Sequence, residues 1–388
     1  MERVSSIFSQ IVRLVPRGLF DEAVARHQGE KHAKGMTCWS QFVAMQFCHL
    51  GGARSLREIT GGLAASEGKL RHLGVQQPPT RSTLAYANQH RAWRIYEDVL
   101  NRLVSMCQAE ARGQKARFRF KHPLLSLDST TIPLCLSMFE WAKYVPAKGA
   151  VKLHLVLDNQ GFLPQYAVLS EGKKADVTVA RQMEFQSGAM LVFDRGYEDH
   201  NWWRKLTAGG VNFVTRLKDS TGYTIVEERP VRAGSCVLRD EVIVLDSEKD
   251  PDHLMRLRRI EVWLEDKQEA IAFVTNNLKL AASTIAAIYR DRWQIELFFK
   301  AIKQSLRIKT FIGTSENAVR IQIWTALISM LLLRYLHVRS SWRWSFSNMV
   351  ALLRQQIFVY RDLWKLLNQP DQPPVDLDAV PLGFAWQG

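Results

Sequence analysis

Three acidic residues occupy positions in the sequence where a carboxylate could take part in chemistry. Asp128 lies inside the apolar, β-rich run LLSLDSTTI, where an unpaired charge is costly. Asp194 ends the continuous apolar run AMLVFD, and Glu296 lies in YRDRWQIELFFKAIK among aromatic and basic residues. Carboxylate oxygens, without paired Cys or clustered His, suit a hard cation. We therefore expect Mg²⁺ at these acids, with Mn²⁺ possible and zinc excluded.

A pair of such ions would support one kind of reaction especially well. Two ions about 4 Å apart stabilise both the attacking and the leaving oxygen of a phosphodiester in an in-line displacement. One ion would activate water or a 3′-hydroxyl, and the other would neutralise charge on the leaving oxygen. We expect Asp128, Asp194 and Glu296 to be both catalytic and metal-binding, with two ions per site. For Asp194, a strand-end cap or a salt-bridge partner is an equally weighted alternative.

The setting of Glu296 adds basic residues to the same surface. At about 100° per residue, Tyr289, Arg292, Glu296 and Lys303 fall within roughly 60° of one another around a helix. Lys300 lies on the same stripe. The helix would thus present one acid to the cluster and several basic residues to phosphates. The alternative is a series of ordinary i,i+4 pairs, Arg292–Glu296–Lys300.

Composition and charge favour a polyanionic partner. The chain has 388 residues, with 47% hydrophobic and 23% charged residues, so it can bury a sizeable core. Its formal net charge is +14, which most simply suits nucleic acid. A basic soluble enzyme without a nucleic-acid partner is equally compatible with the composition.

The sequence also predicts a reducing, cytoplasmic compartment and no membrane association. The five cysteines form no C-x-x-C pair, which argues against a zinc site of that type and against a disulfide framework. The N-terminal stretch MERVSSIFSQIVRLVP has no long apolar region of the signal-peptide kind. The most apolar segment, Ile323–Leu336, is interrupted by Thr325, Ser329 and Arg334, so we expect a buried helix.

The first part of the chain, residues 1–118, is expected to be an N-terminal helical, DNA-binding domain. Helical periodicity covers Trp39–Leu50 and Arg81–Cys107, the second with Ser82 as a plausible N-cap. The segment Ser55–Ala64 begins with Ser55 three residues before a glutamate, a capping-box pattern. Interleaved arginines would suit contacts with DNA. A solvated helical bundle is the alternative.

The next part predicts the core that must position the acids. Short apolar or alternating runs predict strands, and polar periodic stretches between them predict helices. The expected strands are Leu124–Ile132, Ala150–Asp158, Phe162–Ser170, Ala189–Asp194 and Val211–Asp219, with helices at Asp176–Phe185 and His200–Gly209. This order predicts a mixed sheet flanked by helices. Ligands in such sheets gather beyond the carboxyl ends of strands, where Asp128 and Asp194 could be neighbours.

Residues 220–280 are β-rich and look like hairpins of a second small sheet inserted into this core. Helices are then expected at Ser283–Ile308, Ser315–Val338 and Ser347–Leu367. The predicted domain division is thus a core at 119–219 and 281–340, an insertion at 220–280, and a C-terminal helical region with a Pro-rich tail at 341–388.

One spacing is specific enough to indicate a family. Tyr289-x2-Arg292-x3-Glu296-x6-Lys303 matches the Y-(2)-R-(3)-E-(6)-K signature of the IS4-family DDE transposases. The runs LLSLDSTTI and LVFDRGY look like those that carry the family's other two catalytic acids. The β-rich insertion and the preceding helical region also resemble the family's arrangement, so the resemblance covers nearly the whole chain. It implies an α/β (α+β), RNase H-like mixed sheet.

The resemblance also implies roles for individual residues. Asp128, Asp194 and Glu296 would coordinate the divalent metals. The residues expected to contact DNA near the scissile phosphate are Tyr289, Arg292, Lys303, Lys300 and Trp293. Lys300 matches a basic position of some members only. Trp293 sits where some relatives use an aromatic to hold a flipped base, although a place in the core is the preferred interpretation.

Three further residues are weaker candidates. Trp263, in the insertion, resembles Trp293 in its possible use. His154 could approach the site from the strand after Asp128, but a satisfied sheet histidine is the preferred interpretation. Asp176 is expected to cap a helix rather than bind metal.

The resemblance implies a cut-and-paste transposase that binds terminal inverted repeats, frees a 3′-hydroxyl and joins it to target DNA. Its partners would be double-stranded DNA, both transposon ends and target, and a second copy of the chain in a homodimeric active complex at the nucleoid. One alternative is an RNase H-like metal-dependent nuclease without strand transfer, and another is a catalytically silent DNA-binding protein. A carboxylate-pair glycosidase is disfavoured by the positive charge.

Overall fold

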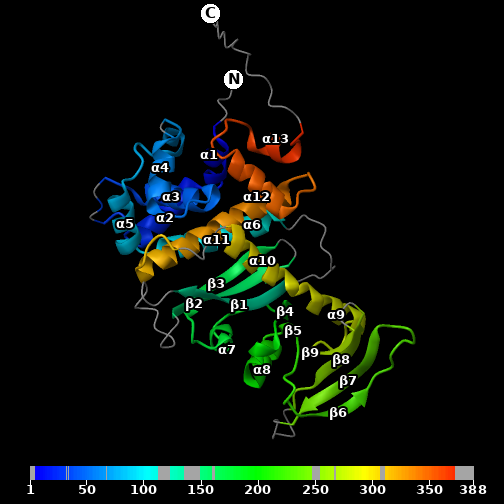
Figure 1. Ribbon diagram of the computed structural model, residues 1–388. Helices are drawn as coiled ribbons and strands as arrows, with labels where there is room; N and C mark the ends of the chain where they lie inside the picture. Colours follow the sequence, from blue (N-terminus) through cyan, green and yellow to red (C-terminus); the bar gives the residue numbers. More distant parts are fainter. Residues whose placement is uncertain are drawn as a thin grey trace, which may run out of the picture.

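A single twisted sheet forms the centre of the protein in the computed structural model (Figure 1). The structure describes residues 5–31, 33, 35–66, 68–111, 123–134, 149–159, 162–246, 254–265, 268–305 and 311–371. Within these residues, the strands are β1 (Leu124–Leu134), β2 (Gly149–Asp158), β3 (Leu163–Glu171), β4 (Met190–Val192), β5 (Asn212–Thr215), β6 (Tyr223–Glu228), β7 (Val237–Leu245), β8 (Leu257–Leu264) and β9 (Glu269–Thr275). Their spatial order is β3-β2-β1-β4-β5-β9-β8-β7-β6.

The directions of the strands confirm the predicted mixed sheet. β3, β2 and β1 form an antiparallel meander, and β4 and β5 then add in parallel beside β1. This order and polarity are those of an RNase H-like sheet. Each parallel connection carries a helix, as short parallel strands require.

The expectation of a second small sheet was wrong. β9 pairs antiparallel with β5, through Val214 opposite Thr275, and β8, β7 and β6 add outward from it. The insertion therefore extends the core sheet instead of forming its own. Hydrophobic alternation predicts strands and hairpins but contains no information on which edge a hairpin joins.

The helices cover both faces of the sheet. They are α1 (Ile7–Val12), α2 (Arg17–Arg26), α3 (Cys38–Gly51), α4 (Leu56–Ala64), η1 (Leu70–Leu73), α5 (Arg81–His90), α6 (Arg94–Ala111), α7 (Asp176–Ala180), η3 (Arg195–Tyr197), α8 (His200–Ala208), α9 (Ala282–Asp291), α10 (Trp293–Ser305), α11 (Glu316–Arg339), α12 (Phe346–Gln355) and α13 (Leu363–Asn368). α6, α10 and α11 contact β1 or β3 on one face, and α7 and α8 cover the other (Figure 1).

The N-terminal helices and the catalytic sheet share one hydrophobic core. A continuous cluster joins Phe8 and Phe42 of the N-terminal helices to Leu155 of β2, Phe298 of α10 and Leu327 of α11. α10 is thus held between the sheet and the helical layer, which fixes the side chains along it. The predicted domain boundaries remain predictions.

Local sequence signals explain several helix starts and one correction. Ser55 caps α4 by accepting a hydrogen bond from the Glu58 amide at 3.2 Å, as predicted, while the Glu58 carboxylate accepts from the Arg54 amide at 2.9 Å instead of the Ser55 amide. The single helix expected at Arg81–Cys107 was wrong, because α5 ends at His90 and α6 begins at Arg94. Thr80, not Ser82, caps α5. Asn317 of α11 donates to the carbonyl oxygen of Arg91 at the break, a tertiary contact that periodicity cannot predict.

Two C-terminal helices were also predicted too long. Ser283–Ile308 divides at Arg292 into α9 and α10, and residues 306–308 lie outside the described residues. Ser347–Leu367 divides into α12 and α13, separated by a segment that bonds to α1 through the Ile7 amide. Cys135 and the Pro-rich tail from residue 372 onward also lie outside the described residues, and Cys38, Cys48 and Cys236 form no disulfide.

The apolar helix α11 is a core helix, as predicted. It is long and apolar enough to span a membrane, but 78% of its most apolar window is buried inside the protein. The polar residues that interrupt it pair with α3. Gln46 donates to the Thr325 carbonyl oxygen at 3.2 Å and accepts from the Ser329 hydroxyl at 2.7 Å, and His49 bonds to the Thr325 hydroxyl at 3.0 Å.

This buried network gives a stability prediction. Gln46→Ala leaves Ser329 without its side-chain acceptor in a buried site and should lower the free energy of unfolding by about 1–3 kcal/mol. Urea unfolding followed by circular dichroism measures the change. Gln182→Ala, at an exposed position, is the control and should change stability little. Equal effects of the two substitutions would contradict the role of the network.

Candidate active site

Strand register places Asp128 and Asp194 side by side. β1 and β4 pair in parallel, with Leu124 opposite Met190 and Ser126 opposite Val192. Continuing the same register by two residues puts Asp128 opposite Asp194. Side chains alternate along a strand, so both carboxylates lie on the same sheet face as Ser126 and Val192. The two predicted acids are therefore neighbours in register where β4 ends, with Asp128 inside β1 and Asp194 just after β4.

The turn after β4 holds Asp194 in place. Its Oδ1 accepts a hydrogen bond from the Gly196 amide at 2.9 Å, and its carbonyl oxygen accepts from the Thr215 hydroxyl at 3.2 Å. A Cβ added at Gly196 would lie 3.0 Å from the same Oδ1, tighter than side chains normally pack. The Arg-Gly pair after Asp194 thus allows the backbone to approach the carboxylate closely.

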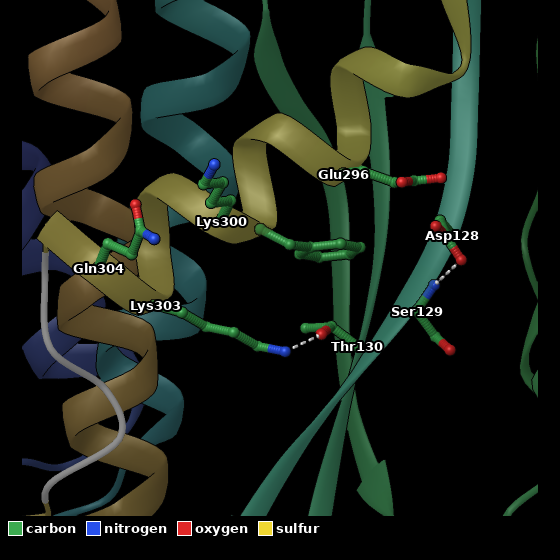
Figure 2. A pocket seen from close by; sticks show the side chains of 8 residues that line it. Asp128, Ser129, Thr130, Glu296, Lys300, Lys303 and Gln304 are labelled. Atoms are coloured by element: carbon green, nitrogen blue, oxygen red, sulfur yellow. Dashed lines mark hydrogen bonds between the residues drawn. The ribbon is translucent and has the colours of Figure 1, made fainter. Parts of the chain in front are cut away.

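Glu296 reaches this region from α10. Figure 2 shows the Glu296 and Asp128 side chains directed toward each other across the gap between α10 and β1. Between them lies the guanidinium of Arg292. Its Nη2 is 2.5 Å from Glu296 Oε1 and its Nη1 is 3.5 Å from Asp128 Oδ2. The structure therefore links two of the three predicted acids through a predicted DNA-contacting residue.

Arg292 marks a small irregularity in the predicted helix. It separates α9 from α10 but keeps right-handed helical angles, φ −53° and ψ −31°. The chain therefore continues on nearly the same path, and Tyr289, Arg292 and Glu296 stay neighbours. The Arg292 guanidinium carbon lies 5.7 Å from the centre of the Tyr289 ring.

The electrostatics of Asp128 are unusual for a carboxyl. Burial raises the pKa of Asp128 from 3.8 to about 7, and the nearby Asp194 and Glu296 carboxylates add to the rise. The Ser129 amide, which donates to Asp128 Oδ1 at 2.7 Å, and Arg292 act in the opposite direction. The ionised form of Asp128 is thus costly, and a bound cation would relieve that cost.

A pocket opens beside the acids along α10. It has a volume of about 370 Å³ and is lined by Asp128, Ser129, Thr130, Glu296, Phe299, Lys300, Lys303 and Gln304 (Figure 2). Lys303 Nζ donates to the Thr130 hydroxyl at 2.5 Å, which ties the lysine to β1 across the pocket. Carboxylates at one end and amines along the other side suit a phosphate group with bound cations.

Of the remaining predicted residues, only Lys300 lines this pocket. Lys300 is exposed on α10. Trp293 is 57% exposed at the start of α10, so its assignment to the core is wrong. Tyr289 is half-buried and packs on Phe273 of β9, with ring centres 4.6 Å apart. Trp263 lies on β8, separated from the core strand β5 by β9.

His154 and Asp176 lie on the other face of the sheet. His154 Nε2 bonds to the Ser170 hydroxyl at 2.7 Å, and burial lowers its pKa to about 4. Asp176 begins α7 and pairs with Lys152 at 3.0 Å. His154 neighbours Ser129 in the register of β1 and β2, and alternation directs it away from the Asp128 face. Ala175, not Asp176, is the N-cap of α7, so the expected helix cap was wrong. His154 is a buried sheet histidine, as preferred, with its Nδ1 3.5 Å from Asp176 Oδ1.

Sequence reasoning missed several polar residues of the site. Thr130 and Gln304 line the pocket, and Thr215 bonds to Asp194. Arg216 follows β5 and is close enough to Tyr289 to affect its pKa. One signal was available: Arg216 follows a strand that runs parallel to the strands of Asp128 and Asp194. The hydrogen bond between Lys303 and Thr130 depends on how α10 packs on β1, and no feature of the sequence predicts it.

The three carboxylates fit a divalent cation in chemistry but are not fully assembled around one. Within the described ranges, no three His, Cys, Asp or Glu side chains are grouped closely enough to hold a metal ion as they stand. The oxygen donors and the raised pKa of Asp128 favour a positive ion there. The Arg292 guanidinium, held between Asp128 and Glu296, shows that this space attracts positive charge.

Comparisons with known proteins agree with this geometry. Residues 119–332 match the family described as "Transposase DDE domain", and residues 3–76 match a domain of unknown function. The "Putative transposase y4zB" of Sinorhizobium fredii is 34% identical over 268 residues, which cover 67% of this chain and 73% of that protein. The "Probable transposase for insertion sequence element IS5377" of Geobacillus stearothermophilus is 30% identical over 250 residues, 64% of this chain and 66% of that one.

A solved structure also aligns with most of the chain. It is the piggyBac transposase in a synaptic complex with hairpin DNA, with 10% sequence identity and a TM-score of 0.46. The alignment covers 90% of this chain and 79% of the other.

The pKa of Asp128 gives a prediction for stability. When the pKa of an acid is raised in the folded state, the protein loses stability as the pH rises from the ordinary pKa of that acid, 3.8, through about 7. Asp128→Asn removes this titration, so the free energy of unfolding of the variant should exceed that of the wild type by about 1–3 kcal/mol at pH 8. At pH 5 the difference should fall to about a third of that, because only part of the interval between 3.8 and 7 has been crossed. Urea unfolding at both pH values measures it.

The control is Asp219→Asn, because the Asp219 side chain is 88% exposed. It should show no such dependence on pH. A difference between wild type and Asp128→Asn that stays the same at pH 5 and pH 8 would contradict the buried, neutralised state of Asp128.

Proposed function

The chain belongs to the transposases with a DDE domain, and on this premise we propose that it catalyses cut-and-paste movement of an insertion sequence. As a DDE transposase it is a phosphoryl-transfer enzyme. In the proposed reaction, water cleaves a phosphodiester bond at each terminal inverted repeat and frees a 3′-hydroxyl. That hydroxyl then attacks a phosphodiester of target DNA, so that one bond forms as another breaks.

The observation that carries the proposal is the register of β1 with β4. It puts Asp128 beside Asp194 on one sheet face, with Glu296 facing Asp128 from α10. DDE transposases use divalent metals, and we propose that these three residues hold two Mg²⁺ or Mn²⁺ ions. When bound, such ions supply charge stabilisation to the attacking and leaving oxygens of the scissile bond.

The basic and aromatic residues beside the acids are proposed to hold DNA. Arg292 and Lys303 would bind phosphate oxygens next to the scissile bond, with Lys300 along the same groove and Tyr289 at its border. The exposed indole of Trp293 offers a stacking surface for an unpaired base. The net charge of +14 would strengthen binding at low salt and make it steeply salt-dependent.

Two further aspects belong to the same proposal. Joining a pair of transposon ends requires two active sites, so we propose a homodimer in the active complex. The helical region at residues 1–118 is proposed to contribute DNA contacts, in the cytoplasm at the nucleoid. Arg91 of that region is engaged inside the protein, with the Met36 carbonyl oxygen and Gln41, and is not available for DNA.

Catalysis by the three acids gives the main test. With Mg²⁺ and DNA carrying the element's ends, wild-type protein should nick the ends and join them to a target plasmid. Asp128→Ala, Asp194→Ala and Glu296→Ala should each lower both steps by at least about 10³-fold, because each loses a ligand of the cations. Binding to the ends, measured by gel shift, should persist.

Glu171→Ala is the control, since the Glu171 side chain is 78% exposed and its strand, β3, is separated from β1 by β2. It should act like wild type. Nicking without joining would instead support a metal-dependent nuclease. End binding with no Mg²⁺-dependent nicking by the wild type would support a catalytically silent DNA-binding protein and exclude the proposal.

Thr130 gives a second prediction as a positioning residue. Thr130→Val removes the hydroxyl that holds Lys303 and should slow cleavage at least about tenfold, the loss of one hydrogen bond to a charged group. Thr130→Ser keeps the hydroxyl and should restore the rate, which a packing defect would not. Thr131→Val, exposed on the next position of β1, is the matched control. No rescue by serine would contradict the role.

A further inference from the structure

The position of Arg292 between Asp128 and Glu296 has a consequence for cation binding. Its two terminal nitrogens reach different acids, Nη2 to Glu296 at 2.5 Å and Nη1 to Asp128 at 3.5 Å. The planar guanidinium is suited to bridging two carboxylates in this way. A divalent cation shared by the same carboxylates would need ligand oxygens about 2.0–2.2 Å away, and hence the same space.

The guanidinium and a divalent cation therefore exclude each other from this space. Arg292 already offsets one of the two negative charges, and the acids' side chains are only 18% and 33% exposed, so the pairing is weakly screened by solvent. A cation must displace the guanidinium before it can bind both acids. The displacement subtracts from the cation's own affinity for the site.

The guanidinium is also incompletely satisfied where it lies. Arg292 Nε is buried and has no hydrogen-bond partner in the part of the chain that the structure describes. A buried donor without a partner costs about 1–3 kcal/mol. A phosphate oxygen of DNA could accept from this group, and guanidinium binds phosphate through paired donors. The two ion pairs thus favour the present position of the guanidinium, and the unpaired Nε lowers the cost of moving it to a phosphate.

We propose that Arg292 is an internal counter-cation that holds the active site closed to divalent metal until a DNA phosphate draws it away. This inference rests on the proposed metal-dependent function. By thermodynamic linkage, phosphate binding to Arg292 then strengthens metal binding to the acids, and metal strengthens DNA binding by the same factor. The device would limit hydrolysis to protein that has already engaged DNA.

The test measures Mn²⁺ binding to the full-length protein without DNA, by isothermal titration calorimetry at pH 8. Arg292→Gln should bind Mn²⁺ about tenfold or more tightly than wild type, within the usual range of such coupling. Arg292→Lys keeps the charge but not the bridging fork and should be intermediate. Circular dichroism confirms that each variant is folded.

Arg290→Gln is the matched control, because it removes the same charge two residues away from an exposed position. It should leave Mn²⁺ affinity within about twofold of wild type, which separates displacement from a general effect of net charge. Equal or weaker Mn²⁺ binding by both Arg292 variants would overturn the inference and leave the proposed function intact. Absence of Mn²⁺ binding to the wild type and to all variants would overturn both.

Discussion

Repulsion among three partly buried carboxylates is the constraint on which this structure depends. Asp128 and Asp194 are adjacent in register, and Glu296 faces Asp128 from α10. Burial, and then the neighbouring carboxylates, raise the pKa of Asp128 to about 7, so its ionised form is unfavourable unless positive charge is supplied. Arg292 supplies that charge from within the chain, and divalent cations would supply it more strongly. Function and instability thus have the same origin at this site.

The fold opposes this repulsion by holding each acid on a separate, well-packed element. Asp128 lies on β1, a central strand flanked on both sides, and the turn after β4 fixes Asp194 through Gly196 and Thr215. α10 buries Phe298 in the core that the N-terminal helices and α11 share. The helical layer therefore supports the catalytic geometry directly, in addition to any contacts it makes with DNA.

Much of this arrangement could be predicted because it is local. A carboxylate inside an apolar run, an apolar strand that ends in Asp194, and helical spacing from Tyr289 to Lys303 are all visible in the sequence. What was missed depends on tertiary pairing. The sequence does not specify that β9 joins the edge of β5, that α5 and α6 separate where Asn317 binds, or that the Arg292 guanidinium lies between two acids.

The central claim is that Asp128, Asp194 and Glu296 together bind divalent cations. Anomalous X-ray diffraction from crystals of the protein bound to Mn²⁺ and DNA tests it most directly. The account predicts Mn²⁺ peaks within ligand distance of carboxylate oxygens of all three residues, with the Arg292 guanidinium turned toward a phosphate. Mn²⁺ peaks that lie away from these residues, or that touch only one of them, would contradict it.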